Sequence, residues 1–233
     1  MIEACLFDVF GTLVDWRSGV ADVARPMFAK RGIDVDPAAF ASRWRGEYDP
    51  AMARVRSGAR GYVPLDDLHL ENLDRTLAHF EIAAQFDEGA RAGLNRAWEQ
   101  LPPWPDTAAG LAAIRAERIV APCSNGSIAL MTRLARHGGL VWDCILGAEV
   151  ARDYKPSSQV YLASCAALAL PPERVLMVAA HNGDLHAARA LGMHTAFIPR
   201  PLEHGPGQTT DLVAEADWDF IAADLTDLAA QLR

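Results

Sequence analysis

The chain has 233 residues, of which 51% are hydrophobic, and its formal net charge at pH 7 is −8. This length suits one large domain, or a core with a smaller inserted domain. The acidic balance argues against a nucleic-acid partner, because phosphate binding needs a basic surface. No apolar run reaches the ~18 residues of a membrane span, and the start lacks a signal-like pattern. We therefore expect a cytoplasmic protein that does not contact a membrane.

The first predicted element is a buried strand at 3–8, an apolar run that ends at Asp8 and is followed by Gly11 and Thr12. Open parallel sheets bind ligands at the carboxyl ends of their strands. Asp8 is therefore a candidate covalent nucleophile, and the flexible backbone at Gly11 is suited to wrap around an anion. The alternative for Asp8 is a turn or N-cap aspartate, and Thr12 has the same alternative of capping the turn.

A helical block without strand-like runs follows, from Val20 to Trp98. Asp36-Pro37 and Pro64 mark helix starts, and the proline-rich stretch 102–106 reads as a linker. The helices are expected at 17–31, 37–58, 66–80 and 87–99.

Apolar runs then alternate with helical patterns, which indicates βαβ units and a mostly parallel sheet. The expected elements are strand 118–122, helix 127–137, strand 143–147, helix 157–168, strand 175–180, helix 184–191 and strand 194–198. The predicted fold class is α/β, a doubly wound and mostly parallel Rossmann-like sheet. We expect residues 1–15 and 103–233 to form this core, and 16–102 an inserted helical cap over Asp8.

Further polar residues follow the later strands. Ser124-Asn125 comes after one apolar run, Lys155 precedes Pro156, and Asp184 follows the last buried run. With Asp8, they resemble the four-motif pattern of the haloacid dehalogenase superfamily: an Asp nucleophile, a Ser/Thr, a Lys and a terminal acid. The resemblance spans essentially the whole chain in the right order.

Most members of this superfamily are phosphatases. Phosphatases that resemble this chain generally carry a second Asp two residues after the nucleophile, where it protonates the leaving alcohol. Phe10 stands there and cannot protonate a leaving alcohol, a loss worth about 10²–10⁴-fold. Ala179 or Ala180 stands where a magnesium-binding acid is expected, and a hard cation needs several oxygen ligands. The resemblance thus implies neither phosphate-ester hydrolysis nor a metal, and we expect no cofactor.

The same departures resemble the L-2-haloacid dehalogenase branch. That resemblance implies that Asp8 displaces the halide and that Lys155 keeps Asp8 ionised. It also implies that two groups receive the departing halide: Arg45, which follows Trp44 as in the branch's Trp-Arg pair, and Asn125. It also implies a small 2-haloacid substrate and a homodimer. Phe10 needs to donate no proton, since a halide leaves as an anion.

Backbone N–H groups near Gly11 and the Ser124 hydroxyl are expected to hold the substrate carboxylate. Asp184 is the base candidate for hydrolysing the Asp8 ester. His181 stands where the branch has Asn, and we expect it to help Asp184 position or activate the water.

Several alternatives stay open. Arg45 could be a solvated helix charge, with Arg43 close enough to confuse the assignment. Another hydrolase on the same nucleophile, a phosphatase or an enzyme opening a strained ring beside a carboxylate, is the nearer functional rival, and a non-catalytic binding module the more distant one. Aromatic residues of the helical block could form a pocket wall or simply core: Trp16, Tyr48, Tyr62, Phe86 and Trp98.

Four cysteines lie in or beside apolar runs without CxxC spacing: Cys5, Cys123, Cys144 and Cys165. Buried, reduced thiols are the expected state, rather than a redox or metal role.

Overall fold

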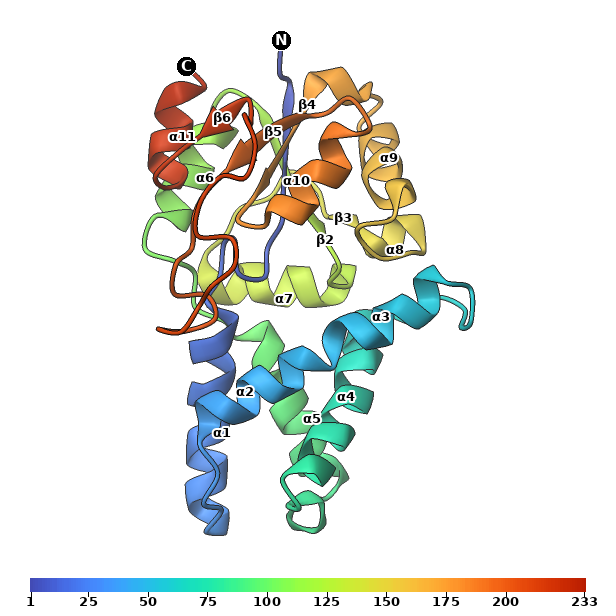
Figure 1. Cartoon of the computed structure of the whole chain (residues 1–233), viewed down its shortest axis with the longest axis vertical. Helices are drawn as coiled ribbons and strands as arrows, with labels where there is room; N and C mark the ends of the chain where they lie inside the picture. Colours follow the sequence, from blue (N-terminus) through green and yellow to red (C-terminus); the bar gives the residue numbers. More distant parts are fainter.

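A six-stranded parallel sheet forms the centre of one half of the molecule in the computed structural model, which describes all 233 residues (Figure 1). The strand order is β3-β2-β1-β4-β5-β6. The strands are β1 (Ala4–Phe7), β2 (Ile119–Ser124), β3 (Leu146–Gly147), β4 (Val175–Ala179), β5 (His194–Phe197) and β6 (Phe220–Ile221). The predicted α/β class with a parallel sheet and an inserted helical cap is confirmed.

β1 lies inside the sheet between β2 and β4, with Phe7 in register with Pro122 and Val178. Its side chains alternate between two buried layers: Cys5 and Phe7 belong to one hydrophobic cluster, and Ala4 and Leu6 to the other. A strand buried on both faces must be apolar throughout, which explains why the run stops at the first residue that carries a charge.

Helices cover both faces of the sheet. They are α6 (Thr107–Arg115), α7 (Ile128–Gly138), α8 (Ala148–Ala151), α9 (Ser158–Ala167), α10 (Asn182–Arg189) and α11 (Leu225–Gln231), with a 3₁₀ turn η3 (Pro172–Arg174). α6 and α11 pack closely on each other, because a Cβ on Gly110 would lie 2.6 Å from the Leu225 Cβ.

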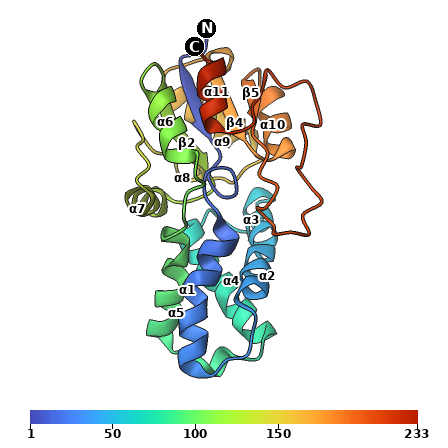
Figure 2. The same cartoon turned by 90° about the vertical axis from the view of Figure 1, so that its left-hand side faces the viewer.

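The helical insertion between β1 and β2 lies at one end of the sheet-containing half in both views (Figures 1 and 2). Its elements are α1 (Trp16–Arg31), α2 (Pro37–Gly46), α3 (Tyr48–Arg56), α4 (Leu65–His79), η1 (Ala83–Gln85), α5 (Glu88–Asn95) and η2 (Arg96–Glu99). Asp36 begins α2 as predicted, since its carboxylate accepts the N–H groups of Ala38 and Ala39.

The expectation of one helix over 37–58 is wrong, because the helix is interrupted at Glu47, between α2 and α3. Pro50 explains the break: it has no N–H for the Gly46 carbonyl, and its ring clashes with a carbonyl one turn back. The Glu47 N–H bonds instead to Trp44 at 3.1 Å, three residues back.

Sequence reasoning did not predict α6, α8, α11 or β6. The sequence of α6 is rich in alanine and contains Gly110, so its apolar period is weak. β6 has only two residues and exists through its pairing with β5.

Two chain segments connect the halves and lie side by side. Val14 forms an antiparallel bridge with Pro103, and the Asp15 N–H donates to the Pro102 carbonyl at 2.9 Å. The Trp104 indole also donates to the Gly11 carbonyl at 2.8 Å. These bonds tie the start and end of the insertion to the loop that follows β1.

No helix combines the length and the apolar character that crossing a bilayer requires. All four cysteines are unpaired; three are buried and Cys144 is half-buried. Burial raises the pKa of the Cys165 thiol to about 11.

Candidate active site

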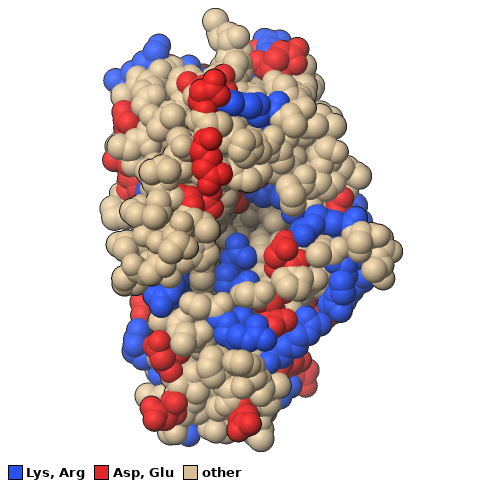
Figure 3. Space-filling model, in the orientation of Figure 1, with Lys and Arg blue, Asp and Glu red and all other residues tan.

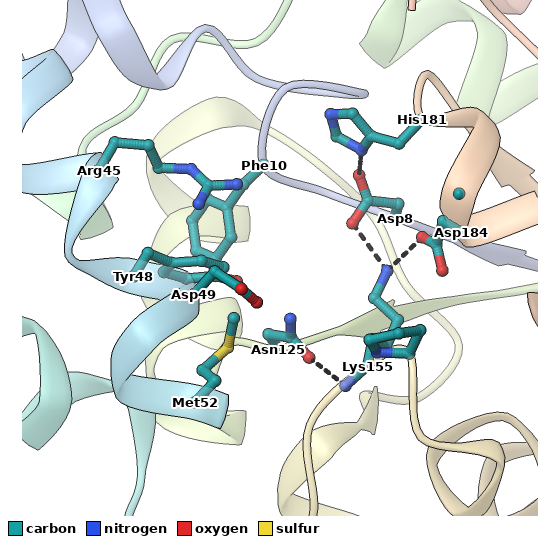
Figure 4. Close-up of a pocket in the computed structure, with 12 residues that line it drawn as sticks. Asp8, Phe10, Arg45, Tyr48, Asp49, Met52, Asn125, Lys155, His181 and Asp184 are labelled. Carbon is teal, nitrogen blue, oxygen red and sulfur yellow. Dashed lines mark hydrogen bonds and ion pairs between the residues drawn. The ribbon is translucent and has the colours of Figure 1, made fainter. Parts of the chain in front are cut away.

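A pocket opens between the carboxyl ends of the strands and the α2–α3 break (Figure 4). On the surface it corresponds to a hollow between the two halves, with Lys and Arg atoms in and beside it (Figure 3). The pocket is lined by Asp8, Phe10, Arg45, Tyr48, Asp49, Met52, Asn125, Lys155, Pro156, His181, Gly183 and Asp184. Seven of the ten residues predicted for the site are therefore brought together here.

The Lys155 ammonium lies between two carboxylates. Its Nζ is 2.8 Å from Asp8 Oδ1 and 2.5 Å from Asp184 Oδ2. The other Asp184 oxygen accepts the hydroxyl of Tyr161, a residue of α9. All three members of the cluster are nearly buried, so each charge depends on its neighbour for stabilisation.

This arrangement fixes the ionisation of the candidate nucleophile. Burial alone would raise the pKa of Asp8, but Lys155 and His181 beside it hold that pKa below its usual value. Burial likewise opposes the charge of Lys155, and the Asp184 and Asp8 carboxylates raise its pKa above the usual value. Asp8 is thus a carboxylate and Lys155 an ammonium at neutral pH.

The two oxygens of Asp8 have different partners. Oδ2 accepts the Thr12 hydroxyl at 2.7 Å and lies 3.1 Å from Nδ1 of His181. Thr12 Oγ1 in turn accepts the Ala180 N–H at 2.9 Å, which ties the loop after β1 to the end of β4. Oδ1 contacts only Lys155.

His181 forms a bridge to a residue that sequence reasoning did not single out. Its Nε2 lies 2.9 Å from Oε2 of Glu203, which is 1% exposed in the loop after β5. Burial opposes a charge on the imidazole, but the Glu203 and Asp8 carboxylates raise the pKa of His181 well above 6.5. Neither nitrogen of His181 bonds to Asp184, the partner expected from the sequence.

Three predicted site residues do not line the pocket. Thr12 lies behind Asp8, and the Ser124 hydroxyl accepts the Gly126 N–H at 3.0 Å. The Gly11 N–H is bonded to the Val14 carbonyl at 3.1 Å. The backbone at Gly11 therefore does not present the free donor that we expected for a substrate carboxylate.

Asn125, which follows β2, is bonded to the loop that carries Lys155. Its Oδ1 accepts the backbone N–H of Lys155 at 2.8 Å, so the amide NH₂ group of Asn125 is the part left for a ligand. Arg56 of α3 donates to the Lys155 carbonyl at 3.1 Å and so joins the helical half to the same loop.

The helical wall carries a cation that has no carboxylate partner. The Arg45 guanidinium lies 3.9 Å from the centre of the Tyr48 ring, and its buried Nε has no hydrogen-bond partner. Arg43, the alternative considered from the sequence, pairs with Glu47 at 2.6 Å. Arg45 is thus the arginine of this helix that the fold directs into the pocket.

Aromatic rings surround Phe10 at the base of this wall. Tyr48 and Trp98 lie edge-on to it at 6.5 and 5.8 Å. Of the aromatic residues left open above, only Tyr48 lines the pocket; Trp16 and Trp98 are buried in the core. Asp49 and Met52 of α3 line the pocket but were not predicted. The expected single helix over 37–58 gave no indication of which of its side chains face the pocket.

No group of three or more His, Cys, Asp or Glu side chains is arranged as a metal site. The space between the Asp8 and Asp184 carboxylates holds the ammonium of Lys155. The absence of a metal requirement stays a prediction, based on Ala179 or Ala180 at the position where the resemblance leads one to expect a magnesium-binding acid.

A model of the haloacid dehalogenase-like hydrolase family matches residues 2–192. The chain belongs to this family, as the four motifs predicted.

Within the family, the chain is similar to several L-2-haloacid dehalogenases. The crystal structure of a defluorinating L-2-haloacid dehalogenase shares 50% identity with a TM-score of 0.98, covering 100% of this chain and 95% of that one. The L-2-haloacid dehalogenase of Xanthobacter autotrophicus with chloropropionic acid covalently bound shares 25% identity with a TM-score of 0.82, covering 100% and 99%. The (S)-2-haloacid dehalogenase H-109 of Pseudomonas putida is 28% identical over 202 residues, 85% of this chain and 86% of that protein. The chain is therefore a member of the L-2-haloacid dehalogenase branch.

Proposed function

We propose that this protein hydrolyses the carbon–halogen bond of short 2-haloalkanoic acids, fluoroacetate included, to give 2-hydroxy acids through an ester on Asp8. The observation that carries the proposal is an ionised carboxylate and an unpartnered guanidinium on opposite walls of one pocket. The printed names of the relatives, which include a defluorinating enzyme and a covalent chloropropionic acid complex, support this substrate class.

In the first step, an Asp8 oxygen attacks the α-carbon in line with the carbon–halogen bond. Lys155 keeps the buried carboxylate of Asp8 ionised, and the contacts of Lys155 and Thr12 with its two oxygens fix its orientation. Fixing the reacting atoms at ~3 Å removes much of the entropic barrier of a displacement. One C–O bond forms as the C–halogen bond breaks.

The halide leaves as an anion and needs charge stabilisation rather than a proton. Arg45 supplies a positive charge, and the Asn125 NH₂ group supplies a neutral donor. In a pocket with little water such preorganised donors are worth far more than in solution. Phe10 and its neighbouring rings limit the water around the halide.

In the second step, water hydrolyses the ester at Cγ of Asp8. Asp184 lines the same pocket and is oriented by Lys155 and Tyr161, so we assign it the role of base. Because the product takes its new oxygen from Asp8, water supplies the oxygen that restores the carboxylate.

The test is halide release from chloroacetate, fluoroacetate and both enantiomers of 2-chloropropionate, with p-nitrophenyl phosphate plus Mg²⁺ as the comparison. We expect halide release with preference for the L-enantiomer, and no comparable phosphate release. A single turnover in ¹⁸O water should place the label in Asp8 and not in the first product. Phosphate release without halide release would refute the proposal.

Three further predictions belong to this proposal. We propose residues 16–102 as the cap, a boundary supported by the bonds that pair Val14 and Asp15 with 102–103. We also propose a homodimer, which the family resemblance suggests. The unpaired cysteines are typical of a reducing compartment and support a cytoplasmic location.

A further inference from the structure

His181 is placed so that both ring nitrogens face carboxylate oxygens. Nδ1 lies 3.1 Å from Asp8 Oδ2, and Nε2 lies 2.9 Å from Glu203 Oε2. Nε2 forms a hydrogen bond with Glu203, and Nδ1 is within ion-pair distance of Asp8. Because a carboxylate only accepts, this position favours the imidazolium, which has an N–H on both nitrogens.

The fold makes specific room for Glu203. Its Oε1 accepts the Trp16 indole N–H at 2.9 Å. A Cβ on Gly11 would lie 2.1 Å from the same oxygen, and the φ of Gly11 is +88°. A buried carboxylate is retained only where donors compensate its lost hydration, and here the donors are Trp16 and His181.

The Asp8 oxygens suggest which one forms the ester. Oδ2 accepts the Thr12 hydroxyl and lies 3.1 Å from Nδ1 of His181, whereas Oδ1 accepts only from Lys155. Attack by Oδ1 leaves Oδ2 as the ester carbonyl oxygen, still held by a hydroxyl and an imidazolium. Two donors aimed at that oxygen are the arrangement that stabilises an oxyanion.

We propose that Glu203 is a positioning residue that keeps His181 protonated, so that His181 and Thr12 together stabilise the oxyanion formed on Asp8 Oδ2 during ester hydrolysis. This inference rests on the proposed function. It gives His181 a role in the second step as a donor, in place of the water-activating role expected from the sequence.

The water oxygen bonds to Cγ, the carbonyl pair moves to Oδ2, and one water proton passes to Asp184. The carbonyl then re-forms at Oδ2, the Cγ–Oδ1 bond breaks, and the departing alkoxide takes the proton from Asp184. Asp8 is left as an acid that ionises, so each turnover releases one proton.

Glu203 matters most once the ester exists. Asp8 loses its negative charge on esterification, so Glu203 remains as the carboxylate in contact with His181. The other titratable group in contact with Glu203 is His204, whose Nε2 lies 3.6 Å from Oε1. Burial lowers the pKa of His204 below 6.5, so this imidazole is neutral and does not replace His181 as a cation. Without Glu203, the imidazole has no carboxylate to retain its second proton.

The test separates the two steps in Glu203→Gln, which keeps an oxygen for Trp16 but removes the charge. Rapid-mixing measurements with L-2-chloropropionate should show a halide burst of one equivalent per site at a rate within ~3-fold of wild type. Ester hydrolysis should slow about 10²-fold, the usual effect of losing an oxyanion donor. The ester should accumulate in mass spectra, and the alkaline fall of the hydrolysis rate should move to lower pH.

Two further variants provide controls. Glu203→Asp retains the charge and should restore the alkaline limb toward that of wild type. His204→Gln, in the same loop, should change hydrolysis less than 2-fold. In the double variant His181→Asn with Glu203→Gln, hydrolysis should be no slower than in His181→Asn alone.

The outcomes distinguish this inference from the proposed function. Wild type that releases no halide from any haloacid would refute the function itself. Active wild type with a Glu203→Gln variant that slows both steps equally, or whose alkaline limb does not move, would overturn the role of Glu203.

Discussion

The two walls of the pocket are built on opposite principles. On the strand-end wall, the Asp8 carboxylate contacts both Lys155 and His181, and Lys155 also contacts Asp184. On the helical wall, Arg45 lies over an aromatic ring with its buried Nε unpartnered. Each charged side chain on the strand-end wall has an oppositely charged partner, whereas Arg45 on the helical wall has no carboxylate partner.

This difference matches the demands of a displacement reaction. A nucleophile must be held in one ionisation state and one orientation before substrate arrives, which a bonded network achieves. A leaving anion needs charge that is available only when it forms, which a cation already paired with a carboxylate cannot supply. Mutations on the two walls should therefore fail in different ways.

The largest effect is expected on the strand-end wall. Asp8→Asn replaces the nucleophile by an amide and should lower halide release by more than ~10⁴-fold, with no ester detectable by mass spectrometry. Halide electrode measurements on protein shown to be folded by thermal melting provide the check. Activity within 10-fold of wild type would mean that water attacks the substrate directly.

On the helical wall, Arg45→Gln should lower kcat for halide release by about 10²-fold, because the departing halide loses its cation. Arg43→Gln is the matched control on the same helix. It removes a half-buried pair with Glu47, which keeps Arg75 as a partner, and should change kcat less than 2-fold. Steady-state kinetics with chloroacetate measure both. Equal effects of the two substitutions would remove the distinction between the walls.

A smaller effect is expected from the apolar part of the helical wall. Met52→Ala creates space beside the pocket and should raise kcat/KM for 2-chlorobutyrate relative to chloroacetate by roughly 10-fold, the scale of one or two methylenes. Because Met52 is also buried, the variant should melt at a lower temperature. An unchanged substrate ratio would place Met52 in the core rather than in substrate selection.

The smallest expected effect concerns stability. Burial opposes the charge on His181, but Glu203 and Asp8 raise its pKa above 6.5, so the folded protein holds a proton that the unfolded chain releases. That stabilisation is complete below about pH 6.5 and is lost as pH rises toward the folded pKa. The urea midpoint of wild type should fall between pH 6.5 and 9, and His181→Asn should lack this part of the fall. Parallel pH profiles for the two proteins would contradict a protonated His181.

Much of the fold could be predicted because the signals are local. The five expected strands, at 3–8, 118–122, 143–147, 175–180 and 194–198, correspond to β1–β5 within a few residues. Each is a short apolar run, and buried parallel strands have no other common sequence form. β6 and α11 escaped prediction because a two-residue strand and a seven-residue helix depend on neighbours for stability.

The site divides in the same way. The sequence by itself indicated the residues of the strand-end wall. Asp8 directly follows β1, Asp184 lies in the first turn of α10 after β4, and Lys155 lies in the loop between α8 and α9, on the side of the sheet where the parallel strands end. Only the tertiary structure decided that Arg45 and not Arg43 faces the pocket, since Arg45 lines the pocket while Arg43 pairs with Glu47. It alone also brought Glu203, in a loop without periodicity and 22 residues after His181, against that imidazole. Contacts of that kind depend on side-chain packing in three dimensions. They produce no regular spacing in the sequence from which they could be predicted.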